Sequence, residues 1–66
     1  MWEVQDKEKN LRILIEHDEC IGYYVYVFEY QSDKSTQDYL YNNLEQAFNA
    51  VKNRFGISKD SFKEIK

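Results

Sequence analysis

The run from Tyr23 to Tyr30 constrains the fold more than any other feature, because it is apolar on both sides of an extended chain. Tyr23, Val25 and Val27 form one alternating set, and Tyr24, Tyr26, Phe28 and Tyr30 form the other. Aromatic and β-branched residues favour strands. A strand that is apolar on both sides suits an interior position in a sheet, where it contributes apolar side chains to both faces of the sheet. We therefore expect this strand to define both faces of a sheet.

Two other segments have the alternation of strands. Leu11 to Ile15 sets Leu11, Ile13 and Ile15 against Arg12 and Leu14, and Thr36 to Tyr41 sets Gln37, Tyr39 and Tyr41 against Thr36, Asp38 and Leu40. Such period-2 patterns predict strands. Trp2 with Val4 is either a short fourth strand or a plug. Phe62 with Ile65 is either a last short strand or a loose tail.

The segment from about Leu44 to about Phe55 predicts a helix. Asn43 stands three residues before Gln46, as in a capping box, and Gly56 suits the left-handed residue that follows a helix. One apolar stripe with the helical period consists of Leu44, Ala47, Phe48, Val51 and Phe55. These elements predict an α+β fold, a three-stranded antiparallel sheet in β-β-β-α order with this C-terminal helix on one face. With no Pro and two Gly, residues 1–66 are expected to be a single domain.

One helix cannot cover both faces of this sheet. If Leu11, Ile13, Ile15, Tyr23, Val25 and Val27 face the helix, an aromatic row lies on the opposite face. This row is predicted as an interface for a homodimer or another protein partner, and its residues are Tyr24, Tyr26, Phe28 and Tyr30, with Tyr39 and Tyr41 at the rim. The reverse assignment of faces, a cover by the Trp2 segment, and a small-molecule site are the alternatives.

The charge of the chain favours protein partners over nucleic acid. Nine Lys and Arg against twelve Asp and Glu give a formal charge of -3. Stacking of single-stranded RNA on the aromatic row is a weaker alternative, because no Lys or Arg interleaves that row. An acidic edge is a second candidate site, suited to inhibiting a basic partner, and consists of Glu16, Asp18, Glu19 and Glu29.

Catalytic and metal chemistry is not expected. The segment from Glu16 to Cys20 clusters His17, Cys20 and carboxylates, but it lacks the further Cys or His ligands of a zinc site and a third group to orient a nucleophile. We predict no catalytic residue, no metal and no cofactor. One Cys, a polar N-terminus and the absence of a long apolar run predict a cytoplasmic protein that does not cross a membrane.

Three segments carry a resemblance as a set: Gly22 to Phe28, Asp38 to Ala47, and Arg54 to Ile57. Together they resemble a group of small bacterial β-β-β-α proteins of uncharacterised function, some of them suspected accessory or immunity-type partners. The Gly-aromatic-x-Val-x-Val stretch and the Leu-Glu-x-Ala helix start are also similar to those of HicB-type antitoxins. Both resemblances imply the fold above more than a function, and the second is compatible with an acidic inhibitor of a basic partner.

Overall fold

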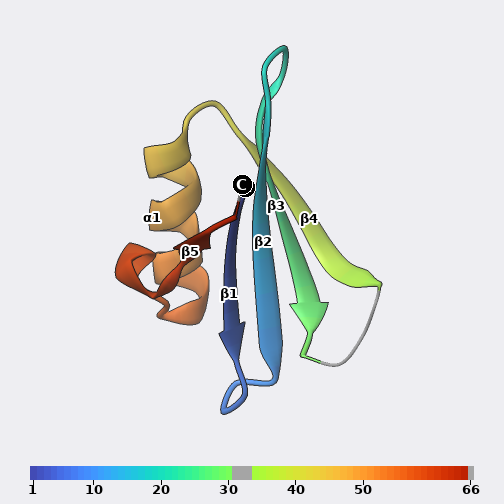
Figure 1. Ribbon diagram of the computed structural model, residues 1–66, viewed down its shortest axis with the longest axis vertical. Helices are drawn as coiled ribbons and strands as arrows, with labels where there is room; N and C mark the ends of the chain where they lie inside the picture. Colours follow the sequence, from blue (N-terminus) through green and yellow to red (C-terminus); the bar gives the residue numbers. More distant parts are fainter. Residues whose placement is uncertain (31–33, 66) are drawn as a thin grey trace.

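The computed structural model describes residues 1–30 and 34–65 of the chain. Its elements follow the order β1 (Trp2–Asp6), β2 (Leu11–Asp18), β3 (Gly22–Glu29), β4 (Ser35–Tyr41), α1 (Leu44–Phe55), η1 (Lys59–Ser61) and β5 (Lys63–Glu64), where η1 is a 3₁₀ turn. Figure 1 shows α1 beside the sheet, with β5 returning to the edge that β1 forms.

The sheet has the order β4-β3-β2-β1-β5, and all its pairs are antiparallel. The predicted α+β fold with one helix and an antiparallel sheet is confirmed, but the prediction of three strands is wrong. Trp2 and Val4 belong to a full strand that pairs with β2 from Trp2↔Ile15 to Asp6↔Leu11, and β5 adds two residues beside β1. The short alternation of Trp2 and Val4 is compatible with a strand or a plug, and it is the pairing with β2 that identifies a strand.

The core lies between the sheet and α1. The β2–β3 register pairs Ile13 with Val27 and Ile15 with Val25, which places all four on one face. Each of these side chains is at most 1% exposed. The buried cluster is completed by Val4, Ala47, Val51 and Ile57. The predicted assignment of the two faces of β3 is therefore confirmed.

The helix has the predicted bounds, and both of its ends are capped. The side chain of Asn43 accepts the backbone N–H of Gln46 at 2.8 Å, and the Gln46 side chain accepts the N–H of Asn42 at 3.3 Å. Gly56 has φ 70°, and its N–H donates to the carbonyl of Lys52 at 2.8 Å. This left-handed terminator turns the chain so that Ile57 enters the core.

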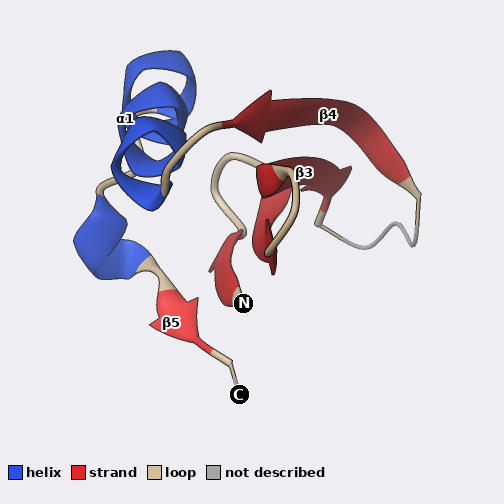
Figure 2. Cartoon of the chain, turned by 90° about the horizontal axis from the view of Figure 1, so that it is seen from above, coloured by secondary structure: helices blue, strands red, loops and turns tan. Residues whose placement is uncertain are grey.

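The sheet curves around the side on which α1 lies, as the view from above shows (Figure 2). At the border of this layer Phe48 is half-buried, with ring centroids 6.3 Å from Trp2 and 5.2 Å from Phe62. Phe48 thus joins the helix to β1 and to the segment before β5.

Because Phe48 holds these two segments against α1, Phe48→Ala is expected to lower the free energy of unfolding by about 3 kcal/mol. Thermal melting followed by circular dichroism measures the loss. The matched control is Asn53→Ala, an exposed position of the same helix. A Phe48→Ala variant that melts at the temperature of the control would contradict this packing.

Gly22 is required at the start of β3. It has φ 138°, and a Cβ built there overlaps the carbonyl oxygen of Tyr41 on β4. Gly22→Ala is therefore expected to cost about 1–3 kcal/mol of stability, since the backbone of β4 must shift. Gly56→Ala is the comparison, because its Cβ would meet no atom within 4 Å and only the left-handed conformation is penalised. Chemical denaturation should give a lower free energy of unfolding for Gly22→Ala than for Gly56→Ala. The reverse order would refute the steric argument.

Candidate functional site

The sheet face opposite α1 carries a contiguous set of large apolar side chains, which we call the open face: Leu14, Tyr24, Tyr26, Phe28 and Leu40. The register pairs Leu14 with Tyr26 across β2 and β3, and Tyr24 with Leu40 across β3 and β4. Leu40 is 48% exposed, and the other four are half-buried. The predicted aromatic row of β3 thus lies on the side of the sheet away from the core.

The aromatic rings of the open face are ordered by contacts along β3. Tyr24 and Tyr26 are stacked, with ring centroids 5.8 Å apart and planes 16° apart. Further along the strand, the guanidinium of Arg12 lies over the Phe28 ring, 4.4 Å from its centroid. An Arg12 nitrogen is also 3.8 Å from a carboxylate oxygen of Glu3 on β1. One end of the open face therefore already holds a cation between an aromatic ring and a carboxylate.

Carboxylates border the stacked tyrosines on both sides. Glu16 on β2 pairs with Tyr24, and Asp38 on β4 pairs with Tyr26. Asp38 accepts the hydroxyl of Ser35 at 2.8 Å. Asp18, where β2 ends, accepts the backbone N–H groups of Cys20 at 2.9 Å and Ile21 at 3.2 Å. These contacts orient the carboxylates of Asp38 and Asp18.

This environment raises the pKa of Tyr26 above its ordinary value. Desolvation is the largest cause, and the negative charge of Glu16 comes next, followed by Tyr24, Asp38 and Asp18. A raised phenol pKa means that folding favours the neutral hydroxyl. Its contribution to stability is complete below pH about 10 and is lost as the pH rises through the folded-state pKa.

Because Glu16 is the largest charged contributor, Glu16→Gln is expected to lower the pKa of Tyr26 toward the ordinary value. Ring carbon shifts of Tyr26, followed by NMR across alkaline pH, measure the change. Glu45→Gln, an exposed acid in the first turn of α1, is the control and should leave this pKa unchanged. Equal titration curves in wild type and Glu16→Gln would show that the carboxylate does not act on the phenol.

Two of the predicted interface residues lie on the other face of the sheet. Tyr39 pairs with Val25 and Tyr41 with Tyr23, so both lie on the helix side and pack against the core, which corrects their placement at the rim of the open face. Arg54 of α1 lies over the Tyr39 ring, 4.5 Å from its centroid. Tyr30 follows β3 and contacts the β1–β2 turn, where its N–H donates to the carbonyl of Asn10 at 3.1 Å.

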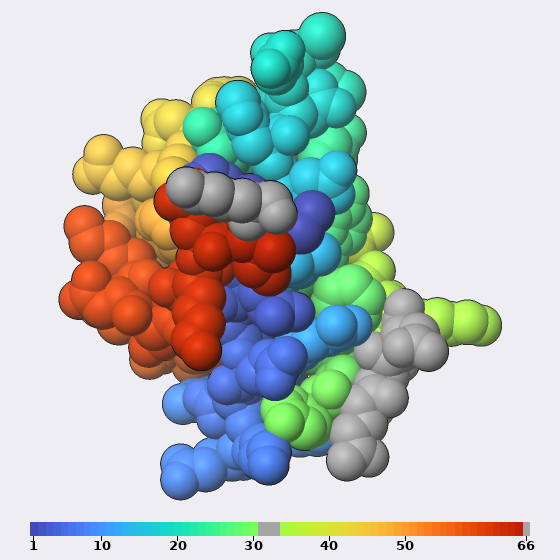
Figure 3. All heavy atoms as spheres, viewed as in Figure 1, coloured from blue at the N-terminus to red at the C-terminus, as the bar shows by residue number. Residues whose placement is uncertain are grey.

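The four residues of the predicted acidic edge do not form one edge. Asp18 pairs with Gly22 at one end of the β2–β3 hairpin, and Glu29 pairs with Leu11 at the other end. Glu19 is exposed at the hairpin tip, which projects from the rest of the molecule in the space-filling view (Figure 3). Only Glu16 and Asp18 lie beside the open face, because strand alternation places them with Leu14.

His17 and Cys20, which were considered for metal chemistry, lie in different surroundings within the β2–β3 hairpin. The imidazole of His17 is stacked on Tyr23 at a centroid distance of 4.4 Å, and Cys20 is exposed at the tip. Within residues 1–30 and 34–65, no three His, Cys, Asp or Glu side chains come close enough together to hold a metal ion.

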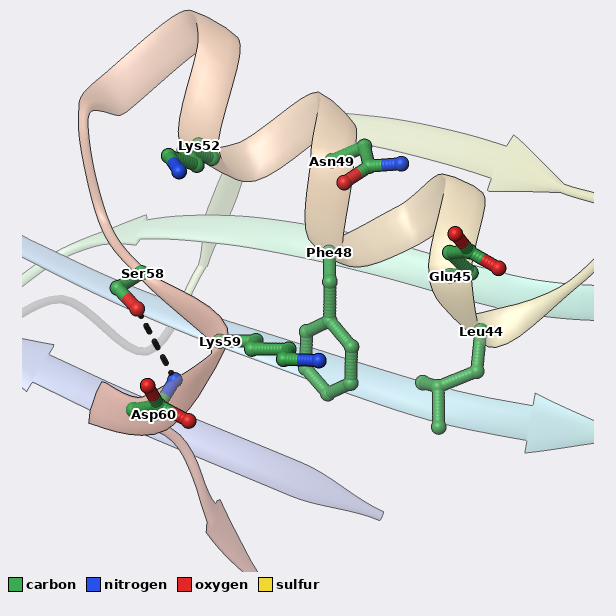
Figure 4. Close-up of a pocket in the computed structure, with 8 residues that line it drawn as sticks. All are labelled: Leu44, Glu45, Phe48, Asn49, Lys52, Ser58, Lys59 and Asp60. Carbon is green, nitrogen blue, oxygen red and sulfur yellow. Dashed lines mark hydrogen bonds between the residues drawn. The ribbon is translucent and has the colours of Figure 1, made fainter.

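A surface groove lies between α1 and η1, and Figure 4 shows the Phe48 side chain pointing from the helix into it. Its other lining groups include Lys52, Lys59 and Asp60, and the dashed line marks the N–H of Asp60 donating to the hydroxyl of Ser58 at 3.2 Å. Cations and anions mix along this groove, so it selects no ligand charge.

The sequence analysis did not include Leu40 of the open face, or Asp38 beside it, among the predicted interface residues. Their alternation in Thr36 to Tyr41 grouped them together, but it did not say which face they share with β3. Only the register across β3 and β4, with Tyr24 opposite Leu40, assigns them to the open face. The same register removes Tyr39 and Tyr41 from it.

Comparison with known proteins gives no relative from which a role could be transferred: no family model, no curated protein and no solved structure matches the chain. No helix in the described part of the chain has both the length and the apolar character needed to cross a membrane.

Proposed function

We propose that the protein is a non-catalytic interaction module that binds a protein partner through the open face. The observation that carries this proposal is the contiguous apolar and aromatic set on the side of the sheet opposite α1. An opposing surface would remove the water contact of Leu40 and of the exposed parts of Tyr24, Tyr26 and Phe28, which stabilises a complex. Tyrosine suits such surfaces, because a large apolar ring ends in a hydroxyl that still forms hydrogen bonds.

A protein partner fits this surface better than a nucleic acid or a small molecule does. The hollows described on the surface lie on other parts of the molecule, between α1 and η1 and between the β1–β2 turn and Ile57. The open face is a sheet surface, and small ligands favour concave sites. Glu16 and Asp38 beside the tyrosines would repel the phosphates of RNA, although the rings alone could stack on bases.

The cytoplasm is the compartment that we propose for this interaction. Cys20 is a free, exposed thiol, and the chain has no second Cys. A fold that depends on packing without disulfides suits a reducing compartment.

Photocrosslinking tests the open face directly in the cells that express the protein. A photoreactive phenylalanine analogue at position 26, where it replaces Tyr26, is expected to give a discrete adduct with a protein after illumination. The matched control carries the same analogue at Asn53, an exposed position of α1. The absence of an adduct from position 26 in the folded protein, or the same adduct from position 53, would refute the proposal.

A further inference from the structure

We infer that the partner of the open face is a basic protein segment, which places an arginine or lysine side chain over the stacked Tyr24 and Tyr26 rings. This inference rests on the proposed function and adds the chemistry of the partner. It follows from the charges that surround the rings and from a cation site of the same kind within the molecule.

The charges of the open face are strongly unequal. Strand alternation and register place four carboxylates and one guanidinium on this side of β1 to β4: Glu3, Glu16, Asp18, Asp38 and Arg12. The ion pairs between described residues join Lys9 to Asp6 and Arg12 to Glu3. Neither of these described ion pairs uses Glu16 or Asp38, the carboxylates on the strands beside the stacked tyrosines, and a positively charged partner would complement them.

The spacing of these groups fits one cationic side chain. Glu16 pairs with Tyr24 and Asp38 with Tyr26, so their backbones are separated by two strand spacings across the sheet and two residues along it, about 12 Å in all. A long cationic side chain lying along β3 would contact the two tyrosine rings and have a carboxylate on each side. Aromatic rings attract such cations most strongly once water is excluded. Arginine is favoured, because its flat guanidinium stacks on a ring while donating to carboxylates.

The other end of the open face shows the same arrangement made by the chain itself. There the Arg12 guanidinium lies 4.4 Å from the centre of the Phe28 ring and 3.8 Å from a Glu3 oxygen. The Tyr24–Tyr26 end also has rings and carboxylates on the same face, with the carboxylates on β2 and β4, whereas Glu3 is on β1. A partner cation there would extend a pattern that this sheet already uses.

A second copy of the chain is a less suitable occupant of this surface. Packing two open faces together would bring four carboxylates of each against those of the other, with one arginine apiece in return. The whole chain also has a formal charge of -3, so two copies repel each other at low salt. Apolar contact between the rings would have to overcome both effects.

The test uses the full chain and an end-blocked pentapeptide that alternates arginine and leucine. NMR titration is expected to shift the amides of Tyr24, Tyr26 and their neighbours, with an affinity that falls as salt is added. The double variant Glu16→Gln/Asp38→Asn should bind at least about tenfold more weakly, since it removes the carboxylates on both sides of the rings. The double variant Glu45→Gln/Asp60→Asn makes the same change in net charge at the groove between α1 and η1, and should bind within about twofold of wild type.

Four results would overturn the inference. The first two are no binding of the peptide and an equal loss of affinity in both double variants. The other two are shift changes confined to residues outside β2, β3 and β4, and equal affinity for a peptide in which citrulline replaces arginine. None of these refutes the proposed function, whose own test is the crosslink at position 26. A crosslinked partner whose contact peptide lacks lysine and arginine, or an adduct of the chain with itself, would keep the interface and reject the basic partner.

Discussion

The antiparallel pairing of β2 with β3 is the interaction on which the rest of the structure depends. Its register sets Ile13 opposite Val27 and Ile15 opposite Val25 on one face, and Leu14 opposite Tyr26 on the other. A slip by one residue would exchange the two faces of a strand and expose the core. The backbone hydrogen bonds between β2 and β3 therefore fix which side chains enter the core and which lie on the open face. A change of register would alter both sets together.

In our proposal the two faces of the sheet have different roles, one in stability and the other in binding. Burial between the sheet and α1 supplies the core, and both helix caps help α1 to begin and end where its apolar stripe meets the sheet. In a domain of 66 residues the core is small. Apolar groups that stay at the surface contribute no burial to the stability of the fold. Binding a partner would recover part of that burial, with the bordering carboxylates selecting the charge of the partner.

Local patterns predicted most of the fold, because strong alternation and capping are properties of neighbouring residues. The helix from Leu44 to Phe55, its Asn43 and Gly56 ends, and the buried side of β3 are such cases. Pairing between distant segments was harder to predict from the sequence. The register with β2 shows that Trp2–Asp6 is a strand, and the register with β3 places Tyr39 and Tyr41 on the helix side. The predicted acidic edge failed for the same reason, since a hairpin sends Asp18 and Glu29 to opposite ends.

The most direct test of this account is the solvent accessibility of methyl groups on the two faces. Relaxation caused by a soluble paramagnetic gadolinium chelate, measured by NMR on dilute protein, should be strong for the methyls of Leu14 and Leu40 and weak for those of Ile13, Ile15 and Val25. That result would establish that α1 covers one face and leaves the other exposed to solvent. Equal protection of both sets in dilute protein would contradict the account, because the face opposite α1 would then be covered by the chain itself.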